Sequence, residues 1–320
     1  MKIETRITEK FKTDKKITTL PFPKKNLLIE ITNCCNNKCI FCYNKYMSRK
    51  KCFINENTCR KALIEAYNLG SREVGFYVTG EPLLNPHLSE YIKTAKSIGY
   101  EYIYITTNGI LATLNKVIEL HKSGLNSIKF SINAYNQNDY KLVNGTDNYN
   151  VVVKNLKDIY NWKKNNNINL KIFTSFITTK FTNNEELIKN TFSNWCDNII
   201  IQPAINQGGL LPNTINQISD PIRKNNFSFP CSYPFDSVII TVEGYVTACC
   251  MDFENLLAYG NLNNKSLIEI WNNLTIKKLR KQHLEKNVRN TVCDNCINNS
   301  KCTPKAINNK FCNNKNILIK

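Results

Sequence analysis

The chain has 320 residues, of which 42% are hydrophobic and 21% are charged, and its formal net charge is +18. This length is sufficient for one large domain followed by a small one. The N-terminus lacks the apolar segment of a signal peptide, and no apolar run is long enough to span a bilayer. These features argue against a secreted or membrane-spanning protein and predict a cytoplasmic one.

The basic charge is spread along the whole chain, where lysines stand among many asparagines and isoleucines. No basic block is interleaved with aromatic residues, as nucleic-acid-binding segments often are, so a nucleic-acid partner is not expected. A solvated basic surface would instead favour encounter with an acidic electron donor, because complementary fields speed association.

Residues 1–26 are expected to be an N-terminal extension, and alternating strand and helix patterns then run from residue 27 to about residue 205. The expected strands are 27–32, 73–78, 101–106, 127–133, 169–177 and 198–203. The expected helices are 57–69, 87–98, 112–123, 150–165 and 184–195. This alternation predicts an α/β fold with a parallel sheet and helices outside it, because parallel neighbours need crossover connections.

Residues 206–230 contain two adjacent glycines and three prolines, and they are expected to form a linker. Residues 237–249 then alternate around Glu243 and Gly244, which predicts a two-strand hairpin. Apolar positions at helical spacing over 267–284 predict a helix. The segment 231–320 is therefore expected to be the second, smaller domain.

Three cysteines with the spacing C-x3-C-x2-C follow the first expected strand: Cys35, Cys39 and Cys42. A 4Fe-4S cluster is normally held by four cysteine thiolates, so three would leave one iron open to chelate a small ligand. The chain has 14 cysteines, and in a reducing compartment such groupings indicate metal sites rather than disulfides. A structural zinc knuckle is the alternative.

This triad, with Phe41 before its third cysteine, resembles the signature of the radical S-adenosylmethionine (radical SAM) superfamily. Thr79, Gly80, Glu81 and Pro82 are similar to the family's Gly-Gly-Glu-Pro motif, with Thr79 in place of the first glycine. Residues 105–109 and 128–133 resemble later strand-end motifs. The resemblance implies a partial (β/α)6 TIM-like barrel with its active site at the C-terminal strand ends. It also implies reductive cleavage of S-adenosylmethionine to a 5'-deoxyadenosyl radical.

The resemblance further suggests which residues contact S-adenosylmethionine. Glu81 and the backbone carbonyls of residues 79–82 would accept hydrogen bonds from its amino group. The other candidates are Ser131 and Ser175 for the ribose or carboxylate, Phe41 and Gln202 for the adenine, and Asn108 in the third strand-end motif. Each candidate has a structural alternative. Thr79 and Gly80 could simply form a turn, Ser131 could be an ordinary strand residue, and Phe41 could be part of the core. No catalytic spacing includes the three histidines, which are expected to be surface or capping residues: His87, His121 and His283.

A second set of cysteines has the pattern C-x17-C and then C-x2-C: Cys231, Cys249, Cys293 and Cys296. The block resembles the SPASM and twitch domains that bind auxiliary clusters, which predicts one auxiliary 4Fe-4S cluster with four thiolates. A full SPASM domain has seven motif cysteines, and here Ala306 replaces one of them. Cys302 and Cys312 could join Cys293 and Cys296 around a second cluster, and a zinc ribbon is the alternative for the whole block.

The auxiliary cluster indicates the class of reaction. It could accept an electron from a hydroxylated substrate radical and leave a ketone, which predicts an oxidoreductase that dehydrogenates a small molecule or sugar.

Cys250, beside a predicted ligand, could donate a hydrogen atom, as a cysteine does in radical SAM epimerases. The alternatives are a maturase or epimerase of a ribosomally made peptide and a non-catalytic metal-cluster protein that binds nucleic acid. The family also implies a flavodoxin- or ferredoxin-type electron donor.

Overall fold

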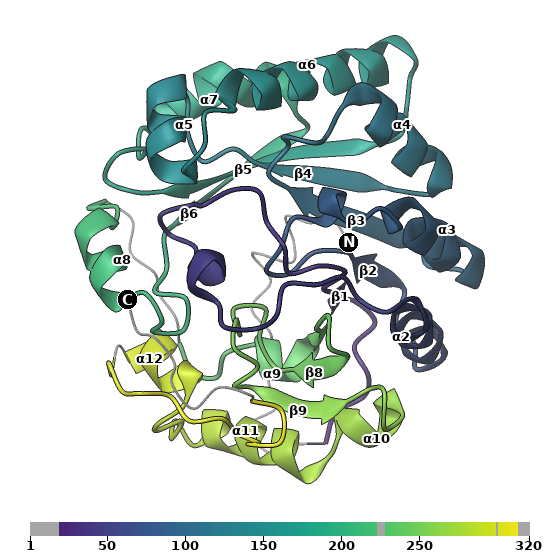
Figure 1. Cartoon of the computed structure of the whole chain (residues 1–320), viewed down its shortest axis with the longest axis vertical. Coiled ribbons are helices and arrows are strands. Elements are labelled where there is room, and N and C mark those ends of the chain that lie inside the picture. Colours follow the sequence, from purple (N-terminus) through teal and green to yellow (C-terminus); the bar gives the residue numbers. More distant parts are fainter. Residues whose placement is uncertain (1–18, 223–227, 299, 313–320) are drawn as a thin grey trace.

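The computed structural model describes residues 19–222, 228–298 and 300–312, which form a mixed α/β structure (Figure 1). Most of the predicted N-terminal extension and residues 313–320 lie outside the described residues. One nine-stranded sheet has the order β6-β5-β4-β3-β2-β1-β7-β8-β9. Its strands are β1 (Leu27–Ile29), β2 (Glu73–Gly75), β3 (Tyr102–Thr107), β4 (Ser127–Ser131), β5 (Lys171–Thr178), β6 (Asn198–Pro203), β7 (Val238–Ile240), β8 (Tyr245–Thr247) and β9 (Ala258–Asn261).

The α-helices are α2 (Glu56–Asn68), α3 (Leu88–Ile98), α4 (Leu114–Ser123), α5 (Gln137–Asn144), α6 (Tyr149–Asn165), α7 (Glu185–Phe192), α8 (Pro212–Ile218), α9 (Tyr233–Asp236), α10 (Leu267–Trp271), α11 (Leu274–Leu284) and α12 (Val292–Asn298). Helices α2 to α7 lie outside the curved sheet (Figure 1). Local sequence sets several ends. The Asn55 side chain accepts hydrogen bonds from the first backbone amides of α2, and α3 and α4 end at the left-handed glycines Gly99 and Gly124. Of the described residues, no helix has the length and apolarity needed to cross a membrane.

The six strands predicted for the first part of the chain are present and parallel, which confirms the α/β fold class. Four α-helices of the described residues were not predicted: α5, α8, α9 and α12. Of these, α8 lies inside the segment 206–230 that was expected to be a linker. Pro212 is at the first position of α8, where a proline is well tolerated because its missing N–H would have no helical partner.

The C-terminal strands extend the same sheet. Strand β7 pairs in parallel with β1, and β8 pairs antiparallel with β7 as the predicted hairpin, with Gly244 at φ +82° in the turn. The predicted helix over 267–284 is divided into α10 and α11, because the Asn273 side chain accepts the Ile276 amide and starts a new helix there. The auxiliary region is thus joined to the edge of the barrel sheet by backbone pairing.

Side chains alternate between the two faces of the sheet. Leu27 and Ile29 point into the main core beneath the helices, whereas Leu28 points to the opposite face. There it packs in a small cluster with one side chain each from β3, β5 and β7, which we call the inner cluster: Leu28, Tyr104, Phe173 and Ile239. Such layers from alternate strands fill the interior of a barrel of this kind.

Candidate functional site

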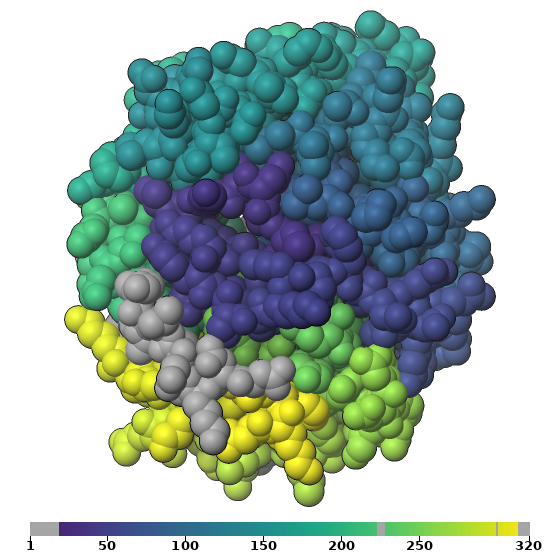
Figure 2. Space-filling view, viewed as in Figure 1, coloured from purple at the N-terminus to yellow at the C-terminus, as the bar shows by residue number. Residues whose placement is uncertain are grey.

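The segment 30–55 between β1 and α2, which we call the cysteine loop, carries Cys35, Cys39 and Cys42. It follows β1 at the C-terminal edge of the parallel strands, and the purple N-terminal segment crosses the middle of the face shown in Figure 2. Burial, together with the charges of Glu81 and Cys42, raises the pKa of the Cys35 thiol to about 11. Burial and the charges of Cys42 and Cys35 likewise raise the pKa of Cys39. Three half-buried thiols that would repel one another as thiolates fit a positively charged iron cluster, which would stabilise their ionised form.

Helix α5 holds the cysteine loop in place. The Cys39 thiol donates to Asn144 Oδ1 at 3.4 Å, and the Lys38 and Ile40 amides donate to the carbonyls of Asn144 and Val143 at 3.0 and 2.9 Å. Sequence reasoning missed Asn144 because it missed α5. This helix therefore fixes one cysteine of the triad by direct contact.

Gly80 lies against the backbone of the cysteine loop. A Cβ atom at this position would lie 2.3 Å from the Thr32 carbonyl oxygen and 2.6 Å from that of Cys34. The next residue, Glu81, donates its amide to the Cys34 carbonyl at 2.8 Å. The glycine is needed here for close approach of two backbones.

The Glu81 carboxylate joins the end of β2 to the end of β3. It accepts hydrogen bonds from the Leu83 amide, the Thr107 hydroxyl at 2.7 Å and the Asn108 amide at 2.6 Å. Burial raises the pKa of Glu81 to about 7, although these donors oppose the rise. Asn108 in turn donates its side-chain amide to Asn36 Oδ1 in the cysteine loop at 2.6 Å. Glu81 and Asn108, both predicted to bind the cofactor, therefore form hydrogen bonds within the protein that fix neighbouring segments.

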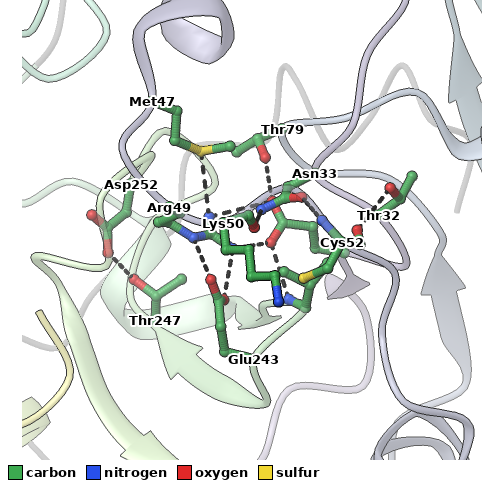
Figure 3. A network of polar contacts seen from close by, with 12 residues as sticks. Thr32, Asn33, Met47, Arg49, Lys50, Cys52, Thr79, Glu243, Thr247 and Asp252 are labelled. Carbon is green, nitrogen blue, oxygen red and sulfur yellow. Dashed lines mark hydrogen bonds and ion pairs between the residues drawn. The ribbon is translucent and has the colours of Figure 1, made fainter. Parts of the chain in front are cut away.

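Thr79 belongs to a buried network of polar contacts (Figure 3). Its hydroxyl donates to the carboxylate of Glu30, which also pairs with Arg49 and accepts the Val242 amide at 3.1 Å. Arg49 makes a second, bidentate pair with Glu243 at 2.8 and 2.7 Å. The network thus connects the end of β1, the cysteine loop, the 79–82 motif and the turn of the C-terminal hairpin. It also gives a structural reason for a threonine where the family motif has glycine.

The remaining predicted contacts lie on neighbouring elements. Ser131 and Ser175 are paired in register on β4 and β5, with their hydroxyl oxygens 3.3 Å apart. Gln202 lies on β6 opposite Ile177, and its side chain is half-buried. Phe41 is 8% exposed and packs in the main core. The structure thus brings the two serines together on adjacent strands, at the end of β4 and within β5.

The four cysteines of the second set line one cavity, which we call the auxiliary cavity: Cys231, Cys249, Cys293 and Cys296. They come from three segments, and Cys293 and Cys296 lie one turn apart on α12. Burial, reinforced by the charge of Cys231, raises the pKa of Cys296 to about 12 and also raises that of Cys293. Four thiols that line one cavity, of which Cys293 is buried and the others are half-buried, fit a fully ligated 4Fe-4S cluster.

The other C-terminal cysteines are not among the residues that line the auxiliary cavity. The Cys302 thiol lies 3.9 Å from Asp294 Oδ2, and Cys312 packs against the main core. Cys250 packs instead against the inner cluster, and its charge contributes to the raised pKa of Cys296. It therefore lies between the auxiliary cavity and the interior of the barrel.

One further residue of the auxiliary cavity is His283 on α11. The prediction that it is a surface or capping residue was wrong, because its side chain is fully buried. The buried positions of α11 are Ile276, Leu279, Arg280 and His283. This spacing is that of one helix face, so helical periodicity was the signal that could have identified the histidine as buried.

Comparison with known proteins gives two family matches. The model of the radical SAM superfamily matches residues 29–193, and that of the SPASM iron-sulfur cluster-binding domain matches residues 231–297. A probable GTP 3',8-cyclase of Saccharolobus solfataricus is 29% identical over 142 residues, which cover 42% of this chain and 43% of that protein. The match thus spans less than half of the relative's length.

Two solved structures have a similar fold. BtrN in complex with AdoMet and 2-DOIA has a TM-score of 0.58 at 18% identity, with coverage of 83% of this chain and 89% of that one. SuiB of Streptococcus suis bound to the precursor peptide SuiA has a TM-score of 0.64 at 18% identity, with coverage of 82% and 67%. At this identity the likeness concerns the fold alone.

Proposed function

Since this chain belongs to the radical SAM superfamily and carries a SPASM domain, we propose that it dehydrogenates a hydroxylated small molecule or sugar. Family membership implies a 4Fe-4S cluster, S-adenosylmethionine and auxiliary iron-sulfur binding. When bound, these groups supply a 5'-deoxyadenosyl radical that takes a hydrogen atom from the substrate carbon and an acceptor for the second electron. The hydroxyl proton leaves to solvent, and the product is a ketone.

The observation that carries this proposal is the position of the auxiliary cavity. Cys249 lines the cavity, whereas the adjacent Cys250 packs against the inner cluster of the barrel. One of the four candidate ligands, Cys249, is therefore the chain neighbour of a residue that packs at the barrel interior. An electron acceptor held there would be close to a substrate bound at the barrel mouth.

The chain's own residues would hold and orient the groups. Cys35, Cys39 and Cys42 would bind the open cluster, and Cys231, Cys249, Cys293 and Cys296 the auxiliary one. The close approach at Gly80 fixes the 79–82 backbone beside the cysteine loop, where its carbonyls would accept the amino group of S-adenosylmethionine. Ser131 and Ser175 would bind the ribose or carboxylate. The excess of basic residues suits an acidic flavodoxin or ferredoxin as electron donor.

The test uses anaerobically reconstituted protein, S-adenosylmethionine, a reductant and a panel of sugars and aminocyclitols deuterated at their carbinol carbons. A substrate of the proposed kind transfers deuterium into 5'-deoxyadenosine and yields one carbonyl product per 5'-deoxyadenosine. The Cys293→Ala variant should still form 5'-deoxyadenosine and lose the carbonyl product, whereas Cys35→Ala should lose both. Deuterium transfer without any oxidised product would exclude dehydrogenation.

A second candidate is maturation or epimerisation of a ribosomally made peptide, supported by the fold likeness to peptide-bound SuiB and by the placement of Cys250. A thiol next to the barrel interior could return a hydrogen atom to a substrate radical, which leaves the substrate without net oxidation; an electron from the external donor and a proton from solvent would then restore the thiol. This function predicts solvent deuterium at a peptide α-carbon in heavy water. Cys250→Ala should abolish that incorporation and leave 5'-deoxyadenosine formation intact.

A further inference from the structure

His283 is a buried polar side chain without a polar partner. Its side chain is fully buried, and neither ring nitrogen has a hydrogen-bond partner among the described residues. The rings of Phe229 and Phe235 pack beside it, with centroids 6.0 and 6.4 Å from its own. A buried donor left without a partner costs free energy, so an imidazole in such surroundings indicates a partner that the protein chain itself does not supply.

The auxiliary cavity is the space where that partner can lie. His283 lines it together with the four cysteines, and most of the other lining residues are apolar, among them Pro234, Met251, Leu257 and Val292. Burial lowers the pKa of His283 to about 4, so at neutral pH the ring is neutral and carries one N–H donor. The four thiols already match the four irons of a cluster, which leaves the histidine free for a different contact.

We propose that His283 donates a hydrogen bond to a sulfur of the auxiliary cluster and thereby raises its reduction potential. A hydrogen bond to a cluster sulfur stabilises the reduced form more, because reduction adds negative charge to the cluster. A higher potential makes the cluster a better acceptor for the electron of a substrate radical. The inference rests on the auxiliary cluster of the proposed function and is independent of which substrate is used.

The first test needs no substitution at His283. The chain has three histidines, and the other two lie elsewhere: His87 precedes α3 and His121 is in α4. Protein with ¹⁵N-labelled histidine in a Cys35→Ala, Cys39→Ala, Cys42→Ala background holds only the auxiliary cluster. Pulsed electron paramagnetic resonance of the reduced cluster should then show a weak nitrogen coupling. No coupling, or the strong coupling of a direct iron ligand, overturns the proposal.

The second test measures the potential in the same background. His283→Phe preserves a flat ring and removes the N–H donor. The ratio of reduced to oxidised cluster at a fixed potential should then fall about tenfold, which means that the reduction potential falls by about 59 mV for one electron. His283→Gln keeps an N–H donor and should recover most of the shift. His121→Phe is the matched control and should leave the potential unchanged.

Iron analysis separates the two ways in which the idea can fail. In the wild-type protein about eight irons per chain correspond to two cubes, whereas about four mean that the auxiliary cluster of the proposed function is absent. If eight irons are present and His283→Phe and His283→Gln both keep the wild-type potential, the role of His283 is excluded and the proposed function stands.

Discussion

The three cysteines near the start of the barrel and the four near the end of the chain have contrasting surroundings. The cysteine loop is held by polar contacts from Asn144, Glu81 and Asn108, and its own Arg49 pairs with Glu243 of the C-terminal hairpin. The auxiliary cavity is lined mainly by thiols and apolar side chains, with His283 as a buried polar group that has no hydrogen-bond partner in the part of the chain that the structure describes. One site is therefore fixed by directional hydrogen bonds, and the other by packing.

This difference fits the two tasks. A cluster with an open iron must keep a free side for S-adenosylmethionine, so its loop cannot be enclosed by packing and needs hydrogen bonds to define its shape. A cluster with four protein ligands needs no free side and can be enclosed, which lowers the local dielectric and makes a single hydrogen bond influential. Substitutions in the polar contacts should therefore disturb the first site selectively.

The largest effect is expected at Arg49. Replacement by leucine leaves the fully buried Glu30 carboxylate without a cationic partner and also removes the ion pair of Glu243, so the free energy of unfolding should fall by about 4 kcal/mol. The measurement is denaturant unfolding of the iron-free protein, with iron content of the reconstituted variant as a second readout. If the network holds the cysteine loop, about four irons should remain, those of the auxiliary site.

A matched control is Lys154→Leu, which removes an exposed ion pair with Asp158 and should change stability by less than about 1 kcal/mol. Adding Glu30→Gln to the Arg49 variant should restore part of the loss, because the buried charge is removed. Equal losses for the Arg49 and Lys154 variants would contradict the importance of the network.

The pH dependence of stability should reveal Glu81. Its folded pKa is raised to about 7 by burial, so the folded protein keeps this proton to higher pH than the unfolded chain does. Stability from this group is complete below about pH 4.5 and is lost as the pH rises through 7, by about 3 kcal/mol in total. Denaturant unfolding of iron-free protein at pH 5 and pH 8 should show this loss in the wild type and not in Glu81→Gln. An exposed control, Glu101→Gln, should follow the wild type, and an unchanged slope in Glu81→Gln would be evidence against the raised pKa.

The features predictable from sequence were those encoded locally. Cys35, Cys39 and Cys42 lie within one short segment, and the six barrel strands carry apolar or alternating patterns at the positions where the structure has strands. Helix α5 was missed because it is short and presents Leu142, 47% exposed, outside its apolar face. The partnership of Arg49 with Glu243 spans 194 residues, so no local pattern reports it.

A smaller effect is expected for Gly80→Ala. The added methyl would meet the carbonyl oxygens of Thr32 and Cys34, so backbone must move, at a cost of about 2 kcal/mol. In reconstituted protein the same displacement should weaken S-adenosylmethionine binding, measured by its perturbation of the cluster spectrum. Gly70→Ala is the control, because a Cβ there meets nothing within 4 Å and tests backbone strain at φ +105° alone. Equal affinity in the two variants would mean that close approach at Gly80 does not matter.

The smallest effect tests the residue that departs from the family motif. Thr79→Gly restores the glycine and removes the hydroxyl that donates to Glu30, so stability should fall by about 1 kcal/mol. Thr79→Ser keeps the donor and should remain close to the wild type in denaturant unfolding. In the Arg49→Leu background the loss from Thr79→Gly should differ from its value in the wild type, because residues that share one network do not act additively. Additive losses in this double-variant cycle would show that Thr79 and Arg49 act on Glu30 independently, and the polar contacts around the cysteine loop would then be separate supports.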